Sequence, residues 1–447
     1  MTDGTGTASA PVRIPEETTV GIIGGGPAGL LLARLLHHSG IGSVVLESRD
    51  RAYAEQRQRA GMLEQTTVDV LRRCGAGARM DREGLVHDGI ELRFGGRSQH
   101  IDFPTLADGR RVTIYAQTEI VKDLISLHLS QMSDSAPLLF GAEVHSVTGI
   151  APGAAGEDGD TQSEGEEAGA GTASARPALH YSYEGRERTL LCDFVVGCDG
   201  SHGVSRSALP TSVAHTYERD YPYSWLGVLA DAPPSCEELI YAHSPRGFAL
   251  HSMRSPTVSR LYLQVPNGTD PEAWPEERVW DELDARFALE SDPDWKLHRG
   301  PITSKSVLPM RSSVTEPMRY GRLFLAGDAA HIVPPTGAKG LNLAVADIAV
   351  LADAFASFRA TGDTGALDAY SGNRLRRVWR AEHFSYFMTT TLHTSPDQSP
   401  FDTRLQLAQL ERIASSRAAA TELAENYAGL ALLDGPGEGA TDPRPFS

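Results

Sequence analysis

The chain has 447 residues, of which 40% are hydrophobic, and its formal net charge is -17 at pH 7. This length predicts two or three domains, and the negative charge disfavours nucleic acid and anionic membranes, because a polyanion would be repelled. The four cysteines form no CxxC pair, which predicts no disulfide, no metal centre and a reducing, cytoplasmic location.

The N-terminal region is polar, and residues 1–17 are predicted to be a disordered tail instead of a signal peptide. The apolar segment from Val20 to Leu36 is interrupted by glycines and falls short of the roughly 20 apolar residues that span a bilayer. We therefore predict no transmembrane helix.

The first ordered segments form a βαβ unit: a strand at 19–23, a helix at 28–38 and a strand at 42–46. The sequence Gly24-Gly25-Gly26-Pro27-Ala28-Gly29 links the first strand to the helix as a GxGxxG motif. Its three motif glycines permit the tight turn, the approach of a pyrophosphate and close packing of helix on strand, and Glu47 is placed to bind a ribose. The unit predicts a dinucleotide site without separating FAD from NAD.

The middle of the chain contains an acidic, Gly/Ala-rich insertion at 151–178, between strands predicted at 138–147 and 179–183. Such a stretch cannot bury enough apolar surface to offset its ordering entropy. We interpret it as a solvated surface loop, with a recruitment site as the alternative.

The remaining pattern predicts two further layers. Strand-like segments punctuated by prolines at 221–263 indicate a separate antiparallel sheet, and segments at 341–359, 365–391 and 403–427 are helical. The predicted domains are an FAD-binding domain at 18–215 and 305–350, a substrate-binding β-sheet domain at 216–304, and a C-terminal helical subdomain at 351–434.

Two later segments favour FAD. Residues 194–200 form a buried strand that runs into Asp199-Gly200, and residues 321–331 form a strand that ends in Gly327-Asp328. In this order after a GxGxxG motif, they resemble the flavoprotein hydroxylase pattern. The resemblance is sharpest to the p-hydroxybenzoate hydroxylase family of class A flavin monooxygenases. It covers about residues 19–430 and is carried by segments 57–61, 84–87, 239–242, 245–250, 327–343 and 424–430.

This resemblance implies an α/β fold, in which a Rossmann-like parallel sheet with a three-stranded crossover is joined to an antiparallel substrate sheet and a helical subdomain. It also implies a homodimer that hydroxylates a 4-hydroxybenzoate-type phenolic acid beside its hydroxyl. FAD is the cofactor, NADPH or NADH the reductant, and dioxygen reacts through a flavin C4a-hydroperoxide.

The resemblance also implies the catalytic residues. Tyr241 hydrogen-bonds the phenolic oxygen, Tyr427 relays its proton, His87 connects the relay to solvent, and Pro335 presents its carbonyl near the phenol. Their chemistry suits the task, because deprotonating the phenol activates the ring, two phenols can pass a proton, and histidine titrates near neutrality.

The substrate carboxylate requires a fixed cation in an apolar pocket, and the planar guanidinium of Arg254 can bind it through two hydrogen bonds. Ser252 and Tyr262 add hydroxyl donors, and Thr336 lies nearby by resemblance. The expected FAD residues are Gly24, Gly26, Gly29, Glu47, Arg57, Arg59, Gln117, Asp328, Lys339, Gly340, Leu341, Asn342 and Arg260, the last in flavin movement. The expected NAD(P)H residues are His202, Arg206, Arg311 and Tyr53, with Arg57 and Arg59 as further candidates.

Some positions depart from the family pattern. Residues 48–55 differ in a region that influences coenzyme choice, which leaves NADPH or NADH open. In the substrate layer, His251, Leu261 and Met62 either repack the wall or admit a substituted ring such as 3-amino-4-hydroxybenzoate or protocatechuate.

The cofactor pattern is compatible with two other functions. A flavin-dependent halogenase would carry a W-x-W motif, and none of the five tryptophans forms one. A flavin-binding sensor of aromatic acids would bind its ligand without forming a hydroxylated product.

Overall fold

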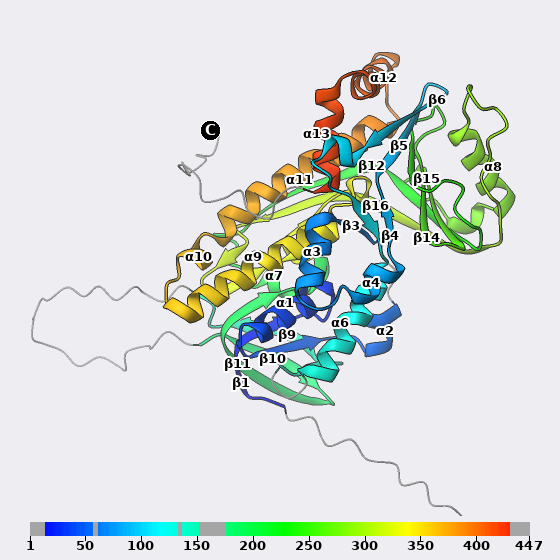
Figure 1. Ribbon diagram of the computed structural model, residues 1–447. Helices are drawn as coiled ribbons and strands as arrows, with labels where there is room; N and C mark the ends of the chain where they lie inside the picture. Colours follow the sequence, from blue (N-terminus) through cyan, green and yellow to red (C-terminus); the bar gives the residue numbers. More distant parts are fainter. Residues whose placement is uncertain (1–13, 57–60, 133–135, 152–175, 430–447) are drawn as a thin grey trace, which may run out of the picture.

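The computed structural model describes residues 14–56, 61–132, 136–151 and 176–429. The predicted disordered tail lies almost wholly outside these residues, as does most of the acidic insertion. The described chain forms two eight-stranded sheets and one three-stranded sheet, with a long helical layer beside them (Figure 1).

The first sheet contains the predicted βαβ unit. Its main path is β17-β18-β11-β1-β2-β8, and the neighbours from β18 to β8 are parallel. The strands are β1 (Glu17–Ile23), β2 (Ser43–Glu47), β8 (Leu138–Phe140), β11 (Arg186–Gly197), β17 (Arg319–Tyr320) and β18 (Leu323–Leu325). The last four residues of β1, Val20 to Ile23, are buried because parallel strands are covered on both faces.

Helices cover one face of this sheet, where α1 (Pro27–His38) packs against α6 (Gln117–Gln131) and α9 (Gly340–Thr361). The other cover is an antiparallel layer of β9 (Glu143–Thr148), β10 (Ala178–Tyr183) and β11. Leu179 of this layer lies so close to β1 that a Cβ on Gly21 would be 2.8 Å from its Cδ1 atom. The parallel sheet with a three-stranded crossover is therefore confirmed.

The second sheet has the order β19-β16-β12-β15-β14-β13-β5-β6 and is antiparallel except between β13 and β5. Its strands are β5 (Gly89–Phe94), β6 (Arg97–Asp102), β12 (His215–Ala230), β13 (Leu239–Ala242), β14 (Ala249–Ser255), β15 (Val258–Pro266), β16 (Ile302–Glu316) and β19 (His331–Ile332). It therefore takes strands from outside 216–304. The earlier strand β5 joins the sheet because it forms hydrogen bonds with β13, which would otherwise be an exposed edge strand.

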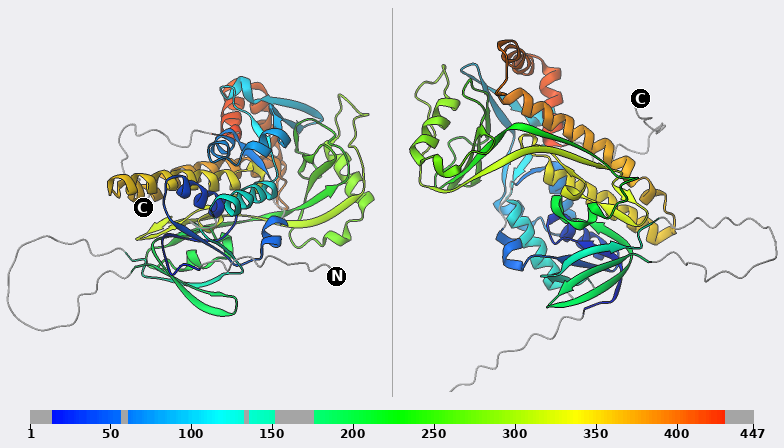
Figure 2. Two further views of the ribbon diagram at one scale, coloured as in Figure 1. Left: turned by 60° about the horizontal axis from the view of Figure 1, so that its bottom comes forward. Right: turned by 180° about the vertical axis from the view of Figure 1, so that it is seen from behind.

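One face of this sheet packs on α8 (Glu276–Phe287). The two longest strands, β12 and β16, extend beyond the sheet toward α11 (Tyr370–Leu392) (Figure 2). A small sheet of β3 (Met62–Glu64), β7 (Val112–Ile114) and β4 (Leu85–His87) lies between the larger ones.

The C-terminal layer is helical, as predicted, and consists of α9, α10 (Gly365–Asp368), α11, α12 (Pro400–Ser415) and α13 (Arg417–Ala428). Shorter elements are α2 (Arg51–Gln56), α3 (Gln65–Arg73), α4 (Ala78–Glu83), α5 (Phe103–Leu106), α7 (Val204–Ser207), η1 (Gly200–His202), η2 (Pro271–Ala273), η3 (Gly327–Ala329) and η4 (Pro335–Gly337). The domain boundaries remain a prediction, and four of them fall inside the continuous elements β1, β12, β16 and α9, those in β1 and β12 after the first residue.

Among the described residues, α9 is the one helix long and apolar enough to cross a membrane. However, 67% of its most apolar stretch is buried inside the protein, where it packs against α1, α3, α10 and α11. Its apolar composition is that of a core helix.

Candidate active site

The glycine loop between β1 and α1 has the geometry of a phosphate cradle. Gly24 has φ +104, and a Cβ there would lie 2.4 Å from the Cys198 carbonyl oxygen, while a Cβ on Gly29 would lie 2.0 Å from the Gly24 carbonyl oxygen. A Cβ on Gly26 would meet no atom within 4 Å. The fold itself thus requires the first and third motif glycines, whereas Gly26 faces open space beside the positive end of α1. These features fit a pyrophosphate.

Glu47 ends β2 beside this loop. Its Oε2 accepts a hydrogen bond from the Gly25 amide at 2.6 Å, and its Oε1 accepts one from the Arg49 amide at 2.8 Å. The carboxylate is therefore fixed at the mouth of the loop. Of the other expected FAD residues, Gln117 is the first residue of α6 and partly buried, whereas Arg57 and Arg59 lie outside the described residues.

The turn that carries Asp328 lies after β18 and is held by Arg206. The Arg206 guanidinium donates to the carbonyl oxygens of Asp328 at 2.8 Å and Ala329 at 2.9 Å. Burial lowers the pKa of Arg206, and nearby Arg311 lowers it further. Arg206 was expected to bind NAD(P)H. In the structure its hydrogen bonds hold the backbone of the turn at Asp328, a contact that no sequence signal indicated.

The other expected NAD(P)H residues are spread over three elements. His202 is exposed in η1, Arg311 is partly buried on β16, and Tyr53 is 47% exposed on α2. The Arg49 guanidinium lies over the Tyr53 ring at 5.4 Å.

The expected substrate residues gather on one face of the second sheet. Tyr241 on β13 pairs with Leu250 on β14, which pairs with Tyr262 on β15, and Ser252 pairs with Arg260. Cross-strand partners and every second residue of a strand share a face. The two tyrosines, Ser252 and Arg260 therefore lie on the same side, where Ser252 Oγ donates to the Arg260 carbonyl at 3.1 Å.

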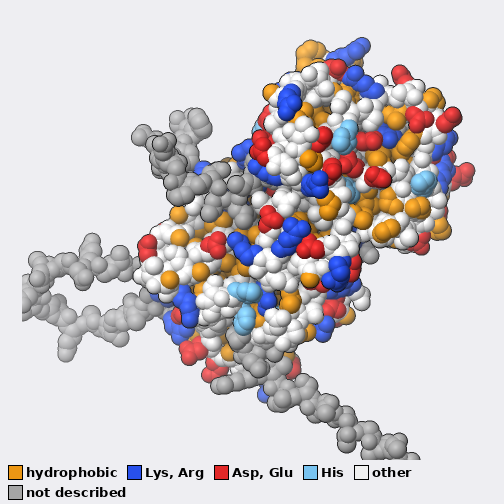
Figure 3. Space-filling model, viewed as in Figure 1, with side chains coloured by type: hydrophobic (Ala, Val, Ile, Leu, Met, Phe, Trp, Pro, Cys, Tyr) orange, Lys and Arg blue, Asp and Glu red, His pale blue; other side chains and the backbone are white. Residues whose placement is uncertain are grey.

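A pair of arginines makes this face locally positive. Burial lowers the pKa of Arg254, and the charge of Arg260 lowers it further, whereas Tyr262 raises it. The Nη1 atom of Arg260 is buried and has no hydrogen-bond partner among the described residues. On the outer surface, by contrast, acidic and basic side chains are mixed on the face drawn in Figure 3. Two neighbouring, half-buried guanidinium groups favour an anionic ligand such as a carboxylate.

Tyr241 on this face contacts Tyr427 of α13 through its hydroxyl group. The Tyr241 and Tyr427 Oη atoms are 2.6 Å apart, and both side chains are buried. Burial raises the pKa of Tyr241 above its ordinary value, which the hydrogen bond from Tyr427 partly offsets. Burial also raises the pKa of Tyr427, and Tyr241 adds to the effect. Both phenols are therefore neutral at physiological pH and can exchange a proton along their hydrogen bond.

His87 is buried on β4, and neither ring nitrogen has a hydrogen-bond partner among the described residues. Burial lowers the pKa of His87 to about 4, although Asp88 acts in the opposite direction. The imidazole is therefore neutral and has a free acceptor. The structure brings the two tyrosines into contact, but it contains no direct hydrogen bond from His87 to either of them.

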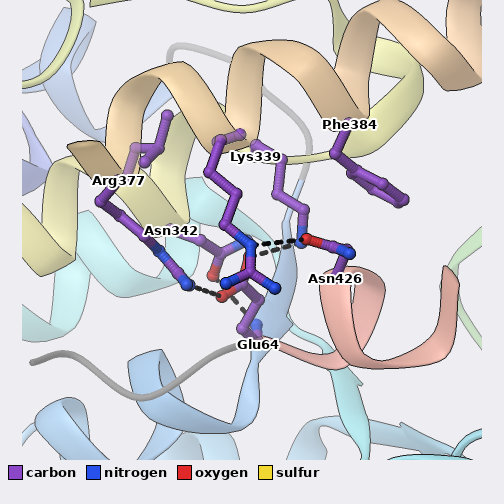
Figure 4. Close-up of a pocket in the computed structure, with 9 residues that line it drawn as sticks. Glu64, Lys339, Asn342, Arg377, Phe384 and Asn426 are labelled. Atoms are coloured by element: carbon purple, nitrogen blue, oxygen red, sulfur yellow. Dashed lines mark hydrogen bonds and ion pairs between the residues drawn. The ribbon is translucent and has the colours of Figure 1, made fainter. Parts of the chain in front are cut away.

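A buried ion pair joins Lys339 to Glu64, and Arg377 and Asn342 lie beside it (Figure 4). Lys339 donates to Glu64 Oε1 at 2.6 Å and to the Tyr427 carbonyl at 3.1 Å, and Arg377 contacts Glu64 Oε2 at 3.5 Å. Asn342 accepts from the Glu64 amide at 2.9 Å. Burial lowers the pKa of Lys339, and Glu64 opposes the shift. Glu64 and Arg377 were not predicted from the sequence, because an isolated Glu and Arg form no motif.

The remaining expected residues surround the start of α9. Pro335 and Thr336 form η4, and the Thr336 hydroxyl accepts a hydrogen bond from Thr389 at 2.9 Å. Gly340 and Leu341 are the first residues of the 22-residue helix α9. The positive N-terminal end of α9 therefore lies next to Lys339, which contacts Tyr427.

Two of the three departures in the substrate layer do not face the substrate residues. His251 pairs with Ile240 and Leu261, and Ile240 and Leu261 pack in the core that contains α8. They lie on the opposite face because side chains alternate along a strand. Of the two alternatives for these positions, repacking of the wall fits His251 and Leu261. Met62 packs in the same cluster as Tyr241 and Tyr262.

Residues 17–385 match the family described as FAD binding domain. The chain therefore belongs to this FAD-binding family, and it is a flavin-dependent aromatic monooxygenase that uses FAD, NAD(P)H and dioxygen. The p-hydroxybenzoate hydroxylase of Acinetobacter baylyi is 46% identical over 414 residues, covering 93% of this chain and 96% of its own.

Solved structures share the fold. The p-nitrophenol 4-monooxygenase of Pseudomonas putida DLL-E4 matches with a TM-score of 0.72 and 19% identity, covering 92% of this chain and 97% of its own. A ternary complex of aklavinone-11 hydroxylase with FAD and aklavinone matches with a TM-score of 0.64 and 21% identity, covering 85% and 70%. These matches confirm the predicted α/β fold, and the Acinetobacter relative confirms the predicted family.

Proposed function

We propose that the protein hydroxylates 4-hydroxybenzoate beside its hydroxyl group to give protocatechuate. The observation that carries this proposal is the contact between the Tyr241 and Tyr427 hydroxyls, next to a sheet face that also carries Arg254 and Arg260. A ring with a carboxylate at one end and a phenol at the other has complementary chemistry. The name of the Acinetobacter relative supports the same substrate.

In this proposal Arg254 binds the substrate carboxylate, and Ser252 and Tyr262 contribute hydroxyl donors. Burial strengthens these bonds because solvent screening is weaker in the interior. The fixed carboxylate sets the distance of the phenol from the arginines and directs it toward Tyr241. Thr336 and the carbonyl of Pro335 border the ring from η4.

The two tyrosines move the phenolic proton. The substrate O–H passes its proton to Tyr241 Oη, Tyr241 passes its own proton to Tyr427 Oη, and Tyr427 releases its own proton toward His87. Each tyrosine gains one proton and loses one, so neither holds a net charge. Their raised pKa values keep both phenols protonated before and after the transfer. His87 is the neutral acceptor beyond them, and a bridging water would complete the hydrogen-bonded path.

The cofactor residues of the proposal are the glycine loop with Glu47, and also Gln117, Asp328, Lys339, Gly340, Leu341, Asn342 and Arg260. Arg57 and Arg59 complete the set outside the described residues. When bound, FAD supplies the redox chemistry that accepts hydride from NAD(P)H and activates dioxygen. His202, Arg206, Arg311 and Tyr53 are the proposed residues for the reductant.

A panel of benzoates tests the substrate. Each acid is scored for stimulation of NADPH and NADH oxidation, and the product is identified by mass. The proposal requires that 4-hydroxybenzoate gives a stoichiometric product with one added oxygen atom. Preference for 3-amino-4-hydroxybenzoate or protocatechuate would replace it with the same chemistry on a substituted ring, for which Met62 is the remaining candidate residue. A sensor would give no product from any acid.

The proposal also includes a cytoplasmic homodimer, which rests on family resemblance. All four cysteines are free thiols, in keeping with a reducing compartment. Light scattering of the purified chain measures the oligomeric state, and a monomer mass would refute the dimer.

A further inference from the structure

Three ionisable side chains are buried behind the turn that carries Asp328. Asp347 on α9 is 0% exposed, His331 on β19 is 1% exposed and Arg374 on α11 is 2% exposed. Asp347 Oδ2 accepts from His331 Nε2 at 2.6 Å and from the Gly327 amide at 3.0 Å, while Oδ1 accepts from Arg374 Nε at 2.8 Å. The carboxylate thus connects two helices and a strand to one backbone N–H of the turn.

Burying these three ionisable groups carries a large desolvation penalty. Burial alone would raise the pKa of Asp347, but the charges of His331 and Arg374 outweigh it and keep the pKa below the ordinary value. The carboxylate is therefore ionised. Buried ion pairs often stabilise a fold no more than apolar side chains of similar volume. The distinctive effect of such a network is to fix geometry, and the group that it fixes here is the Gly327 amide.

The turn is held from two directions. Gly327 has φ +60, a conformation that favours glycine, and its N–H points to Asp347 in the core. From the other direction Arg206 holds the carbonyls of Asp328 and Ala329. The backbone around Asp328 is therefore fixed at Gly327 by Asp347, and at Asp328 and Ala329 by Arg206. A fixed backbone restricts the direction of the Asp328 side chain.

We infer that Asp347 is a positioning residue that aims the Asp328 carboxylate at the cofactor, with His331 and Arg374 orienting Asp347. The inference rests on the proposed function, in which Asp328 binds FAD. It assigns a role to a carboxylate that is 0% exposed and whose hydrogen bonds go to Gly327, His331 and Arg374.

The test is the FAD dissociation constant of the flavin-free protein, measured by fluorescence titration. Asp347→Asn keeps the shape, but its NH2 group must face either Arg374 or the donors of Gly327 and His331. FAD binding should weaken by at least about tenfold, because a misdirected Asp328 carboxylate loses its hydrogen bond to FAD. An unchanged dissociation constant would overturn the inference. The matched control is Tyr370→Phe, which removes the hydrogen bond from Tyr370 to the Leu325 carbonyl in the same core layer.

Thermal unfolding of the flavin-free proteins separates positioning from general destabilisation. Both variants should lower the Tm, but only Asp347→Asn should weaken FAD binding. If Tyr370→Phe weakens it equally, the effect is structural and the inference fails. Should Asp347→Asn not fold, His331→Leu removes one donor from the same oxygen, and unaltered FAD affinity in that variant would equally count against the inference.

A double-mutant cycle with Asp328→Asn locates the effect. If Asp347 acts through Asp328, adding Asp347→Asn to Asp328→Asn should weaken FAD binding less than about twofold further. Additive losses would show that Asp347 acts by another route. Failure of the wild-type protein to bind FAD would instead contradict the proposed function, so the two failures are distinguishable.

Discussion

The glycine loop and the substrate face are built in opposite ways. The loop consists of six consecutive residues, and steric contacts with the chain itself require Gly24 and Gly29. The substrate face takes Tyr241, Arg254 and Tyr262 from three strands and adds Tyr427 from α13, 186 positions away from Tyr241. A site within one segment depends on backbone fit, whereas an assembled site depends on the register of its strands.

This difference predicts how each region fails. A side chain added to the loop acts on the cofactor and on the fold together, because the same backbone serves both. A side chain removed from the substrate face leaves the sheet in place and changes a single chemical step.

The largest effect should come from Gly29→Ala. Its Cβ would lie 2.0 Å from the Gly24 carbonyl oxygen, so α1 cannot pack on β1 without moving. We expect loss of bound FAD and a lower Tm for the flavin-free protein. Flavin absorbance and thermal unfolding measure the two effects.

Gly26→Ala is the matched control, because its Cβ meets no atom of the chain within 4 Å. The Tm of the flavin-free protein should be unchanged, while FAD affinity falls because the methyl group occupies the space needed by the pyrophosphate. If Gly26→Ala binds FAD normally, the pyrophosphate does not approach this glycine.

Tyr241→Phe should reduce hydroxylation next most strongly. The variant keeps the ring but loses the hydroxyl that contacts Tyr427, so the phenolic proton has no acceptor. Loss of such proton transfer lowers the rate by about 10²–10⁴-fold. Oxygen consumption should continue with release of hydrogen peroxide, and the ratio of product to NAD(P)H oxidised measures the uncoupling.

Tyr223→Phe is the control for this prediction, because Tyr223 is also buried in the cluster that contains Tyr241. It should remain coupled. Efficient hydroxylation by Tyr241→Phe would refute the proposed proton path.

Arg254→Ala should weaken substrate binding. Removing one partner of a buried, charge-assisted contact costs about 2–5 kcal/mol, which corresponds to a KM increase of roughly 30-fold or more. FAD content should stay normal because Arg254 is not among the proposed cofactor residues. Arg246→Ala, at an exposed arginine that pairs with Glu282, should leave KM unchanged. An equal effect of both variants would mean that overall charge, and not a specific contact, binds the acid.

The same contrast explains what the sequence could predict. The βαβ unit follows from local periodicity and glycine spacing, and the structure places β1, α1 and β2 within two residues of the predicted bounds. The tyrosine pair was identified by family resemblance, since residues so distant in sequence give no local signal. The Glu64–Lys339 and Asp347–His331 contacts were missed, because tertiary packing alone brings them together. Sheet faces were missed where register was unknown, as at His251 and Leu261.

The smallest predicted effect sharpens that last point. Burial lowers the pKa of His251 to about 4, and its Nε2 accepts a hydrogen bond from the Ser235 amide at 3.1 Å. Because the unfolded chain binds this proton near pH 6.5, the neutral histidine stabilises the fold above that pH. The stabilisation is lost as the pH falls toward 4. Between pH 7 and pH 5 the wild-type protein should lose about 2 kcal/mol more unfolding free energy than His251→Leu.

Urea unfolding at the two pH values, with saturating FAD, measures this difference. His251→Leu should also leave KM and substrate preference unchanged, because the side chain lies on the face opposite Tyr241. Met62→Ala, in the cluster of Tyr241 and Tyr262, should change substrate preference without changing the pH dependence of stability. If His251→Leu alters the choice among ring-substituted benzoates, the two faces of the sheet are coupled, and the back of the substrate sheet contributes to specificity.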